Sequence, residues 1–293
     1  VSVALYTWFF EAKYLTNEGV FMKIAVACES TCDLTSELVK ENNIYVTPFH
    51  VVLGDEEFLD DDNLTSKMLF DYVDKTGTLP KTAAITVGEY EDFFKSVLAE
   101  NDAVIFIGLS SQISSTQSNA ILAANNVKNV YVIDSKSLST GIGLLVLSAC
   151  DKVKQNMELN EIVSKVKAEV ERVQASFVLN TLKFMHKGGR CSVFALLGAQ
   201  ALGIKPKIEV DHTGKMVVER KYSDDILAEH NPDLTRAFIT YSSRPDCTDK
   251  IVEKVKKFGF KEVYETTAGA TVSSHCGPET LGILFIDKES DEN

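Results

Sequence analysis

A hydroxyl-rich segment at residues 109–118 is the part of the sequence that most directly suggests binding chemistry. It reads LeuSerSerGlnIleSerSerThrGlnSer and holds five Ser and one Thr. An apolar run precedes it and a predicted helix follows it, so side-chain hydroxyls and free backbone N–H groups converge where the helix dipole favours an anion. Because the segment has no basic residue, a carboxylate suits it better than a polyphosphate. An ordinary helix cap and turn would use the same residue types.

Three other polar positions could reach such an anion. Thr82 follows a proline and could donate to an oxyanion. His275 precedes the last apolar run of the chain and could donate to a carboxylate or act as a base. The turn LysGlyGlyArg at residues 187–190 presents two cations. Each position also has an ordinary interpretation. Thr82 could simply belong to a turn, His275 could have a structural role, and the turn at 187–190 could face solvent.

The first half of the chain alternates predicted strands and helices. Most of the strands are apolar on both faces, which indicates a mostly parallel sheet covered by helices, and such sheets bind ligands at the carboxyl ends of their strands. The acidic run at residues 55–62 is predicted to be a solvated loop. The predicted strands are 24–28, 45–53, 103–109 and 130–134, and the predicted helices are 33–42 (opened by Asp33), 66–75, 88–100, 115–126, 141–154 and 158–174.

The pattern changes near residue 175, where a second, mixed α/β unit is predicted. The sequence therefore indicates a two-domain α/β protein with an N-terminal domain at 22–175 and a C-terminal domain at 176–293. Residues 1–21 are expected to be a non-native or peripheral extension. The second unit has predicted strands at 177–179, 206–210, 216–222, 237–241, 263–266 and 281–286, a hairpin turn at 211–214 and a helix at 248–258.

Composition and missing motifs exclude several classes of function. The formal net charge of −12 and the sequence pI near 5.0 argue against a nucleic-acid partner and against stable membrane insertion. The six cysteines form no CxxC pair, so no zinc site is expected, and reduced thiols fit a cytoplasmic protein. GlyIleGly at 141–143 lacks the third glycine of a dinucleotide fingerprint, and no P-loop is present, so no cofactor is expected.

Five segments in order resemble motifs of the DegV family, over about residues 22–288. They are CysGluSerThrCysAspLeu at 28–34, LeuProLysThrAlaAlaIleThrValGlyGlu at 79–89, LeuSerSerGlnIleSerSerThrGlnSerAsnAla at 109–120, LysGlyGlyArg at 187–190 and HisCysGlyPro at 275–278. The chain departs from the family pattern at several positions. Glu29 stands where the family usually has Asp, 83–85 lack its Ser-Gln-Pro, Ser115 replaces a Gly, and the stretch 222–233 is shorter than usual.

The resemblance implies a protein that holds one long-chain fatty acid, such as palmitate, stearate or oleate, in a cleft between its two domains. It implies that Thr82, Ser114 and His275 bind the carboxylate. It also implies a binding protein without catalytic residues, which presents the acid to a separate fatty acid kinase in some members. Further residues expected near the head group are Ser115, Thr116, Ser30, Arg190 and Gly277.

Two other functions stay open from the residues alone. Ser114, His275 and Asp134 could form the triad of a serine hydrolase, although no GxSxG motif is present. A subunit of a kinase for a small metabolite is the second alternative, and the missing nucleotide motif counts against it. The apolar lining of a tail-binding cleft is expected from Ile113, Phe177, Leu196, Leu197, Leu202 and Phe285.

Overall fold

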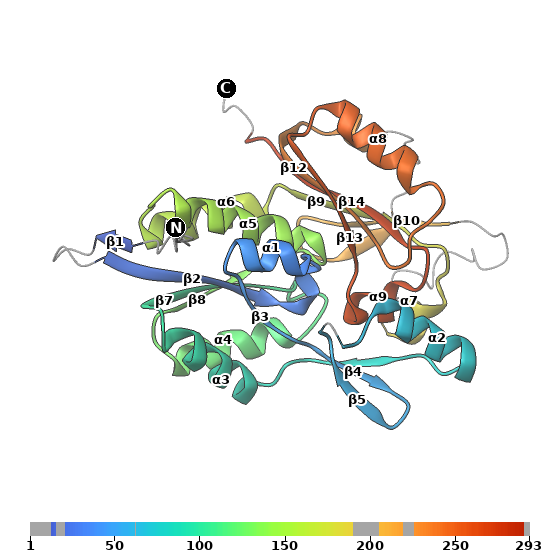
Figure 1. The fold of residues 1–293 in the computed structure, drawn as a ribbon, viewed down its shortest axis with the longest axis horizontal. Coiled ribbons are helices and arrows are strands. Elements are labelled where there is room, and N and C mark those ends of the chain that lie inside the picture. Colours follow the sequence, from blue (N-terminus) through green and yellow to red (C-terminus); the bar gives the residue numbers. More distant parts are fainter. Residues whose placement is uncertain (1–12, 16–20, 62, 190–204, 219–225, 290–293) are drawn as a thin grey trace, which may run out of the picture.

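The computed structural model describes residues 13–15, 21–61, 63–189, 205–218 and 226–289. In this part of the chain the strands form three sheets, two large and one small (Figure 1). Residues 13–15, which belong to the stretch expected to be an extension, pair with the first long strand. Leu196, Leu197 and Leu202, three of the expected lining residues, lie outside the described residues.

The first sheet is mostly parallel, as predicted. Its order is β1-β2-β7-β8 with β3 also on β2, and each of these pairs is parallel except β1–β2. All six residues of β7 are buried, which explains why its sequence is apolar on both faces. The strands are β1 (Lys13–Leu15), β2 (Phe21–Glu29), β3 (Tyr45–Thr47), β7 (Ala103–Gly108) and β8 (Val130–Asp134).

Helices cover both faces of this sheet. Figure 1 shows α5 and α6 on one side and α3 and α4 on the other. Helix α1 (Ser36–Glu41) starts later than predicted, because Thr35 caps it while Asp33 has a left-handed φ of 51° and lies outside the helix. The covering helices are α3 (Val87–Leu98), α4 (Thr116–Asn126), α5 (Thr140–Lys154) and α6 (Leu159–Val170).

The second sheet is mixed, in agreement with the predicted mixed α/β unit. Its order is β11-β10-β9-β14-β12-β13, and among its described pairs only β12–β13 is parallel. Helix α8 (Thr248–Phe258) covers one face (Figure 1). The strands are β9 (Val173–Val178), β10 (Lys207–Val210), β11 (Met216–Val218), β12 (Pro232–Tyr241), β13 (Glu262–Thr267) and β14 (Leu281–Asp287), and η4 (Ile226–Glu229) precedes β12.

A small antiparallel sheet, β5-β4-β6, lies beside three short elements that complete the fold. The prediction of a loop at 55–62 is wrong in part, because Glu56–Leu59 form the edge strand β5. Exposed glutamates on such an edge keep it from pairing with another chain. These elements are β4 (His50–Leu53), β6 (Lys81–Ala83), η1 (Ser30–Cys32), α2 (Ser66–Thr76), α7 (Lys183–Lys187) and α9 (Ala270–Cys276).

Helix α5 joins the two large sheets. It packs on β2 and β7 of the first sheet and on β12 and β14 of the second, and its Ile142, Leu145 and Val146 are fully buried. A single apolar cluster extends from Val26 of β2 to Phe238 of β12. The two halves of the chain therefore share a core, and the domain division at residue 175 stays a prediction.

Candidate functional site

A cavity of about 200 Å³ lies where the first half of the chain meets the second sheet and α9. An engineered apolar cavity of about 150 Å³ already takes up benzene, so this space is large enough for a ligand. Its wall combines hydroxyl-bearing and apolar side chains from both halves. The apolar part of the wall includes Phe49, Ile113, Leu138, Phe177, Met185, Met216, Val272 and Leu284, and the polar part includes Thr31, Thr82, Ser114, Ser115, Ser139, Thr240, Ser242, Thr271, His275 and Thr280.

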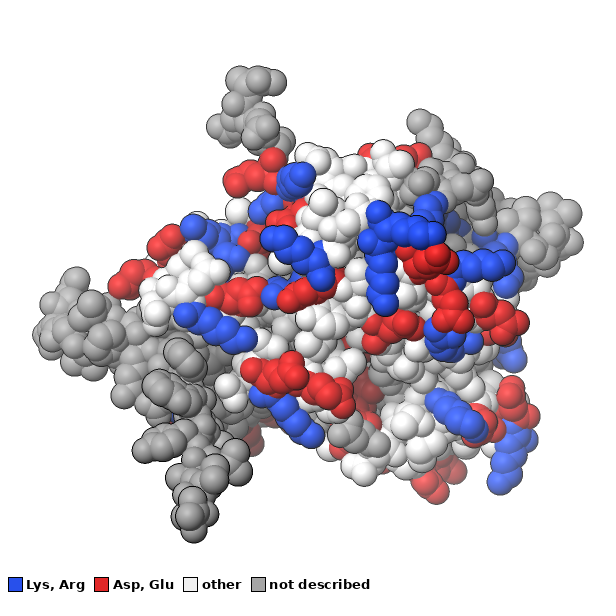
Figure 2. All heavy atoms as spheres, turned by 45° about the horizontal axis from the view of Figure 1, so that its top comes forward, with Lys and Arg blue, Asp and Glu red and all other residues white. Residues whose placement is uncertain are grey.

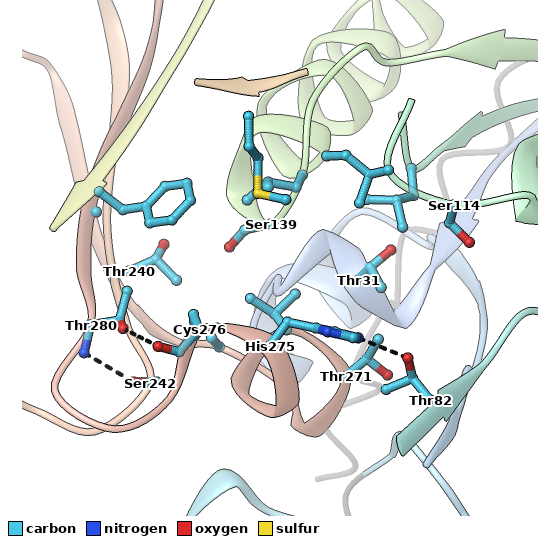
Figure 3. A pocket seen from close by; sticks show the side chains of 18 of the residues that line it. Thr31, Thr82, Ser114, Ser139, Thr240, Ser242, Thr271, His275, Cys276 and Thr280 are labelled. Atoms are coloured by element: carbon cyan, nitrogen blue, oxygen red, sulfur yellow. Dashed lines mark hydrogen bonds between the residues drawn. The ribbon is translucent and has the colours of Figure 1, made fainter. Parts of the chain in front are cut away.

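Thr82 and His275 meet at one end of this cavity (Figure 3). Thr82 lies on β6, whose register on β4 pairs it with Val51, and His275 lies in the last turn of α9. The Thr82 Oγ1 atom is 2.8 Å from Nε2 of His275. When the ring hydrogen is on Nε2, His275 donates to Thr82, and the threonine O–H is left to donate to a ligand.

Ser114 lies in the loop that joins β7 to α4, at the same end of the cavity as Thr82 and His275 (Figure 3). Its Oγ accepts a hydrogen bond from the N–H of Thr116 at 3.3 Å, so its O–H can donate to a ligand. Ser115 also lines the cavity and makes no side-chain cap to α4. The structure therefore brings Thr82, Ser114, Ser115 and His275 to one cavity.

Three other expected head-group residues, Thr116, Ser30 and Gly277, do not line this cavity. Thr116 is fully buried and donates to Glu29 at 3.1 Å. Ser30 donates to Asp60 at 2.9 Å. Gly277 has a φ of 77°, and its carbonyl accepts from Ser242. Arg190 lies outside the described residues.

Of the residues expected to form an apolar lining, Ile113 and Phe177 line this cavity and Phe285 does not. Phe285 packs on Phe260 in the cluster between the second sheet and α8. Gly282 and Leu284 of β14 line the cavity instead, because successive side chains along a strand point to opposite faces.

Sequence reasoning missed Thr31, Ser139 and Thr271, which also line the cavity. Thr31 is the neighbour of Ser30, so the sequence predicted the segment that reaches the cavity but not the residue that lines it. Thr271 was not predicted to line a site, because the helix on which it lies, α9, was not predicted from the sequence. The buried Thr271 Oγ1 atom has no hydrogen-bond partner among the described residues. Thr271 lies one helical turn before His275 on α9.

A buried carboxylate, Glu29, lies behind this wall. It accepts hydrogen bonds from the Leu109 N–H at 2.7 Å, from Thr31 at 3.3 Å, and from Thr116 and Tyr90. Burial raises the pKa of Glu29 above its ordinary value, and these hydrogen bonds oppose the shift. Since Thr31 and Leu109 both line the cavity, Glu29 fixes two positions of the wall.

The residues of the alternative hydrolase triad are not arranged as one. Asp134 does not line the cavity, and its carboxylate accepts the backbone N–H of Lys136 at 3.0 Å and that of Ser111 at 3.3 Å. Nε2 of His275 faces Thr82. Cys276, another nucleophile in the wall, is a protonated thiol at neutral pH because burial raises its pKa to about 12.

The described residues show neither a metal site nor a membrane-spanning helix. No group of three or more His, Cys, Asp or Glu side chains among them could hold a metal ion. Within the same residues, each helix is too short or too polar to cross a bilayer. On the face shown in Figure 2, acidic and basic side chains are interspersed, so the described part of that face has mixed charge.

Comparison with known proteins agrees with the fold and with the resemblance to the DegV family. The DegV family model matches residues 23–288. The protein DegV of Bacillus subtilis is 29% identical over 283 residues, which cover 91% of this chain and 100% of that protein.

Two solved structures share the fold. The crystal structure of DegV from Bacillus subtilis, described as a fatty acid binding protein, has a TM-score of 0.80 at 28% identity and covers 91% of this chain and 100% of its own. A DegV family protein from Thermus thermophilus, described by its fatty acid binding, has a TM-score of 0.84 at 24% identity, with 90% and 99% of the two chains covered. The family model covers most of the chain, and the chain therefore belongs to the DegV family.

Proposed function

We propose that this protein binds one long-chain fatty acid. The carboxylate lies against Thr82, Ser114 and His275, and the tail lies along the apolar wall. The observation that carries the proposal is a cavity in which Thr82, Ser114 and His275 lie at one end and apolar side chains such as Phe177, Met216 and Leu284 also form the wall, which matches the two parts of a fatty acid. Binding of fatty acids by related DegV proteins supports it.

The tail supplies most of the affinity. Each buried methylene contributes about 0.8 kcal/mol, so a chain of sixteen carbons offers on the order of 10 kcal/mol before the entropy of binding is subtracted. Phe177, Met216 and Leu284 provide apolar surface for it. Deep in the wall, the hydroxyls of Ser242 and Thr280 donate to backbone carbonyls, so they are already satisfied next to an apolar tail.

The head group requires donors, because a buried carboxylate without hydrogen bonds is strongly unfavourable. Ser114 and Thr82 offer O–H groups, and the imidazole of His275 contacts the Thr82 hydroxyl. These side chains orient the acid without a fixed cation. A carboxylate held by such donors keeps an oxygen lone pair for reaction with a second protein.

A partner protein and a place in the cell follow from binding of a fatty acid. We infer that the bound acid is presented to a separate fatty acid kinase, which forms the acyl phosphate, so that this chain carries no catalytic residues. The resemblance of its motifs to those of DegV proteins supports this step. Among the described residues, Cys28, Cys32, Cys150, Cys247 and Cys276 are free thiols, which fits the reducing cytoplasm.

Native mass spectrometry of the purified chain, followed by denaturing extraction of lipids, tests the binding proposal. One fatty acid per chain is the expected result. The variant His275→Ala should retain less acid than the wild type, whereas His212→Ala, which changes an exposed histidine in the hairpin turn, should retain as much. A protein that is isolated empty and takes up neither palmitate nor oleate would refute the proposal.

Two further measurements separate the alternatives. An activity probe for serine hydrolases should leave Ser114 unlabelled, and stoichiometric labelling there would favour the hydrolase. Calorimetry should show no binding of ATP by the isolated chain, and a clear signal would favour the kinase subunit.

A further inference from the structure

Helix α9 brings its residues to the cavity from the second half of the chain. Thr271, Val272, His275 and Cys276 all line the cavity, so the position of this helix sets one side of the wall. The helix has seven residues and no side-chain cap of its own at Gly269. The N–H groups at its start therefore need partners from elsewhere.

Two carboxylates from the first half of the chain are these partners. The N–H of Gly269 donates to Oδ1 of Asp33 at 2.8 Å, and the N–H of Ala270 donates to Oδ1 of Asp60 at 2.7 Å. The two aspartates are buried, with 5% and 6% of their surface exposed. Both contacts give these N–H groups the acceptors that a helix start lacks, and so stabilise α9 in its place.

The second oxygen of each carboxylate is held as well. Ser139, which lines the cavity, donates to Oδ2 of Asp33 at 2.5 Å. Ser30, the neighbour of the lining residue Thr31, donates to Oδ2 of Asp60 at 2.9 Å. Each aspartate thus connects α9 to another part of the same cavity wall.

Gly269 leaves the room that this contact uses. A Cβ atom at this position would lie 3.0 Å from Oδ1 of Asp60 and 3.2 Å from Oδ1 of Asp33. Both distances are shorter than a usual van der Waals contact, so a side chain would push the carboxylates away from the helix.

We propose that Asp33 and Asp60 are positioning residues of the head-group site, which hold α9 so that His275 meets Thr82. This inference rests on the proposed binding of a fatty acid for its effect on affinity. The effect of the two aspartates on the position of the histidine ring does not require a ligand. Neither aspartate belongs to the cavity lining, so each acts through the residues that it holds.

The test compares Asp60→Ala with Asp60→Asn and measures binding of palmitate and of its methyl ester. Asp60→Ala should weaken palmitate binding at least tenfold and leave the ester within twofold, because the ester does not depend on the alignment of His275 and Thr82 for a charged head group. Asp60→Asn keeps an oxygen acceptor for the Ala270 N–H and should restore most of the palmitate affinity. Asp102→Ala is the control, since Asp102 also accepts a backbone N–H, from Lys23, at the opposite end of β7.

Nitrogen NMR of labelled histidines in the empty protein gives the ligand-independent readout. Asp60→Ala should shift the His275 signals and leave those of His212 unchanged. If Asp60→Ala does not fold, Ser30→Ala, which removes the donor to Asp60, should give the same shift to a smaller degree. Unmoved His275 signals, or an equal loss of palmitate and ester affinity, would overturn the inference. Shifted His275 signals in a protein that binds neither lipid would uphold it and overturn the proposed function.

Discussion

The hydroxyl of Thr82 lies 2.8 Å from Nε2 of His275, although 193 residues separate the two in the sequence. The contact joins the small sheet of the first half to α9 of the second half. In the proposed function, the two side chains act together on one carboxylate. Their contributions to binding should therefore depend on each other.

A double-mutant cycle on Thr82→Val and His275→Gln checks this dependence. Hydrogen bonds to a charged group contribute about 1.5–3 kcal/mol, so each single variant should weaken fatty acid binding by roughly tenfold or more. Because either change disrupts the shared contact, the double variant should lose less than the sum of the single losses. Calorimetry of palmitate binding measures all four proteins. Strictly additive losses would mean that the two side chains act separately.

Gly188→Ala should weaken fatty acid binding by displacing the imidazole ring of His275. A Cβ atom on Gly188 would lie 2.6 Å from Nδ1 of His275 and 3.0 Å from the carbonyl oxygen of Phe184, so the ring or the turn must move. The backbone of Gly188 has an ordinary φ of −72°, so the alanine itself is not strained. Palmitate affinity should fall while the ester affinity changes little.

Gly189→Ala is the matched control for this variant. Gly189 has a φ of 73°, and no atom of the described residues lies within 4 Å of its Cβ position. Alanine there should lower the free energy of unfolding by roughly 1–2 kcal/mol through backbone strain and should spare palmitate affinity. The prediction fails if Gly189→Ala weakens binding as much as Gly188→Ala does.

The sequence predicted the frame of the fold because buried strands carry a strong local signal. The apolar run at 103–108 became β7, and the hydroxyl loop that follows it lies at the cavity. Helix α9 was missed because residues 270–276, AlaThrValSerSerHisCys, lack an apolar stripe, and the carboxylates that stabilise its start are distant in sequence. Asp33 was expected to open a helix, but its partner is Gly269, 236 residues away. Such contacts depend on tertiary packing, which no local pattern encodes.

Thr271→Val should stabilise the empty protein and weaken palmitate binding. A buried hydroxyl without a partner costs about 1–3 kcal/mol, and valine has the same shape without the hydroxyl. In the proposed function the Thr271 hydroxyl donates to the head group, one helical turn from His275, so its loss should reduce affinity several-fold. Urea denaturation and calorimetry measure the two effects. Thr140→Val is the control and should destabilise, because the buried Thr140 hydroxyl is hydrogen-bonded to Thr240 at 2.7 Å.

Stability should fall as the pH rises from about 4 to 8. Burial raises the pKa of Asp33 from its ordinary 3.8 to about 8, the charge of Asp60 raises it further, and the bonds from Ser139 and Gly269 oppose the shift. The native state therefore keeps a proton that the unfolded chain has lost within this window, and each unit of pH lowers the free energy of unfolding by up to about 1.4 kcal/mol. Above pH 8 this loss is complete. Burial also raises the pKa of Glu29, which contributes a slope of the same sign.

Urea denaturation at pH 5, 6, 7 and 8 measures this slope. Asp33→Asn cannot titrate at this position, so its stability should depend less on pH than that of the wild type. Asp102→Asn, which changes an exposed carboxylate, should keep the full slope. If the stability of Asp33→Asn depends on pH as strongly as that of the wild type, the retained proton resides on another buried group. Glu29→Gln would then be the next variant to measure.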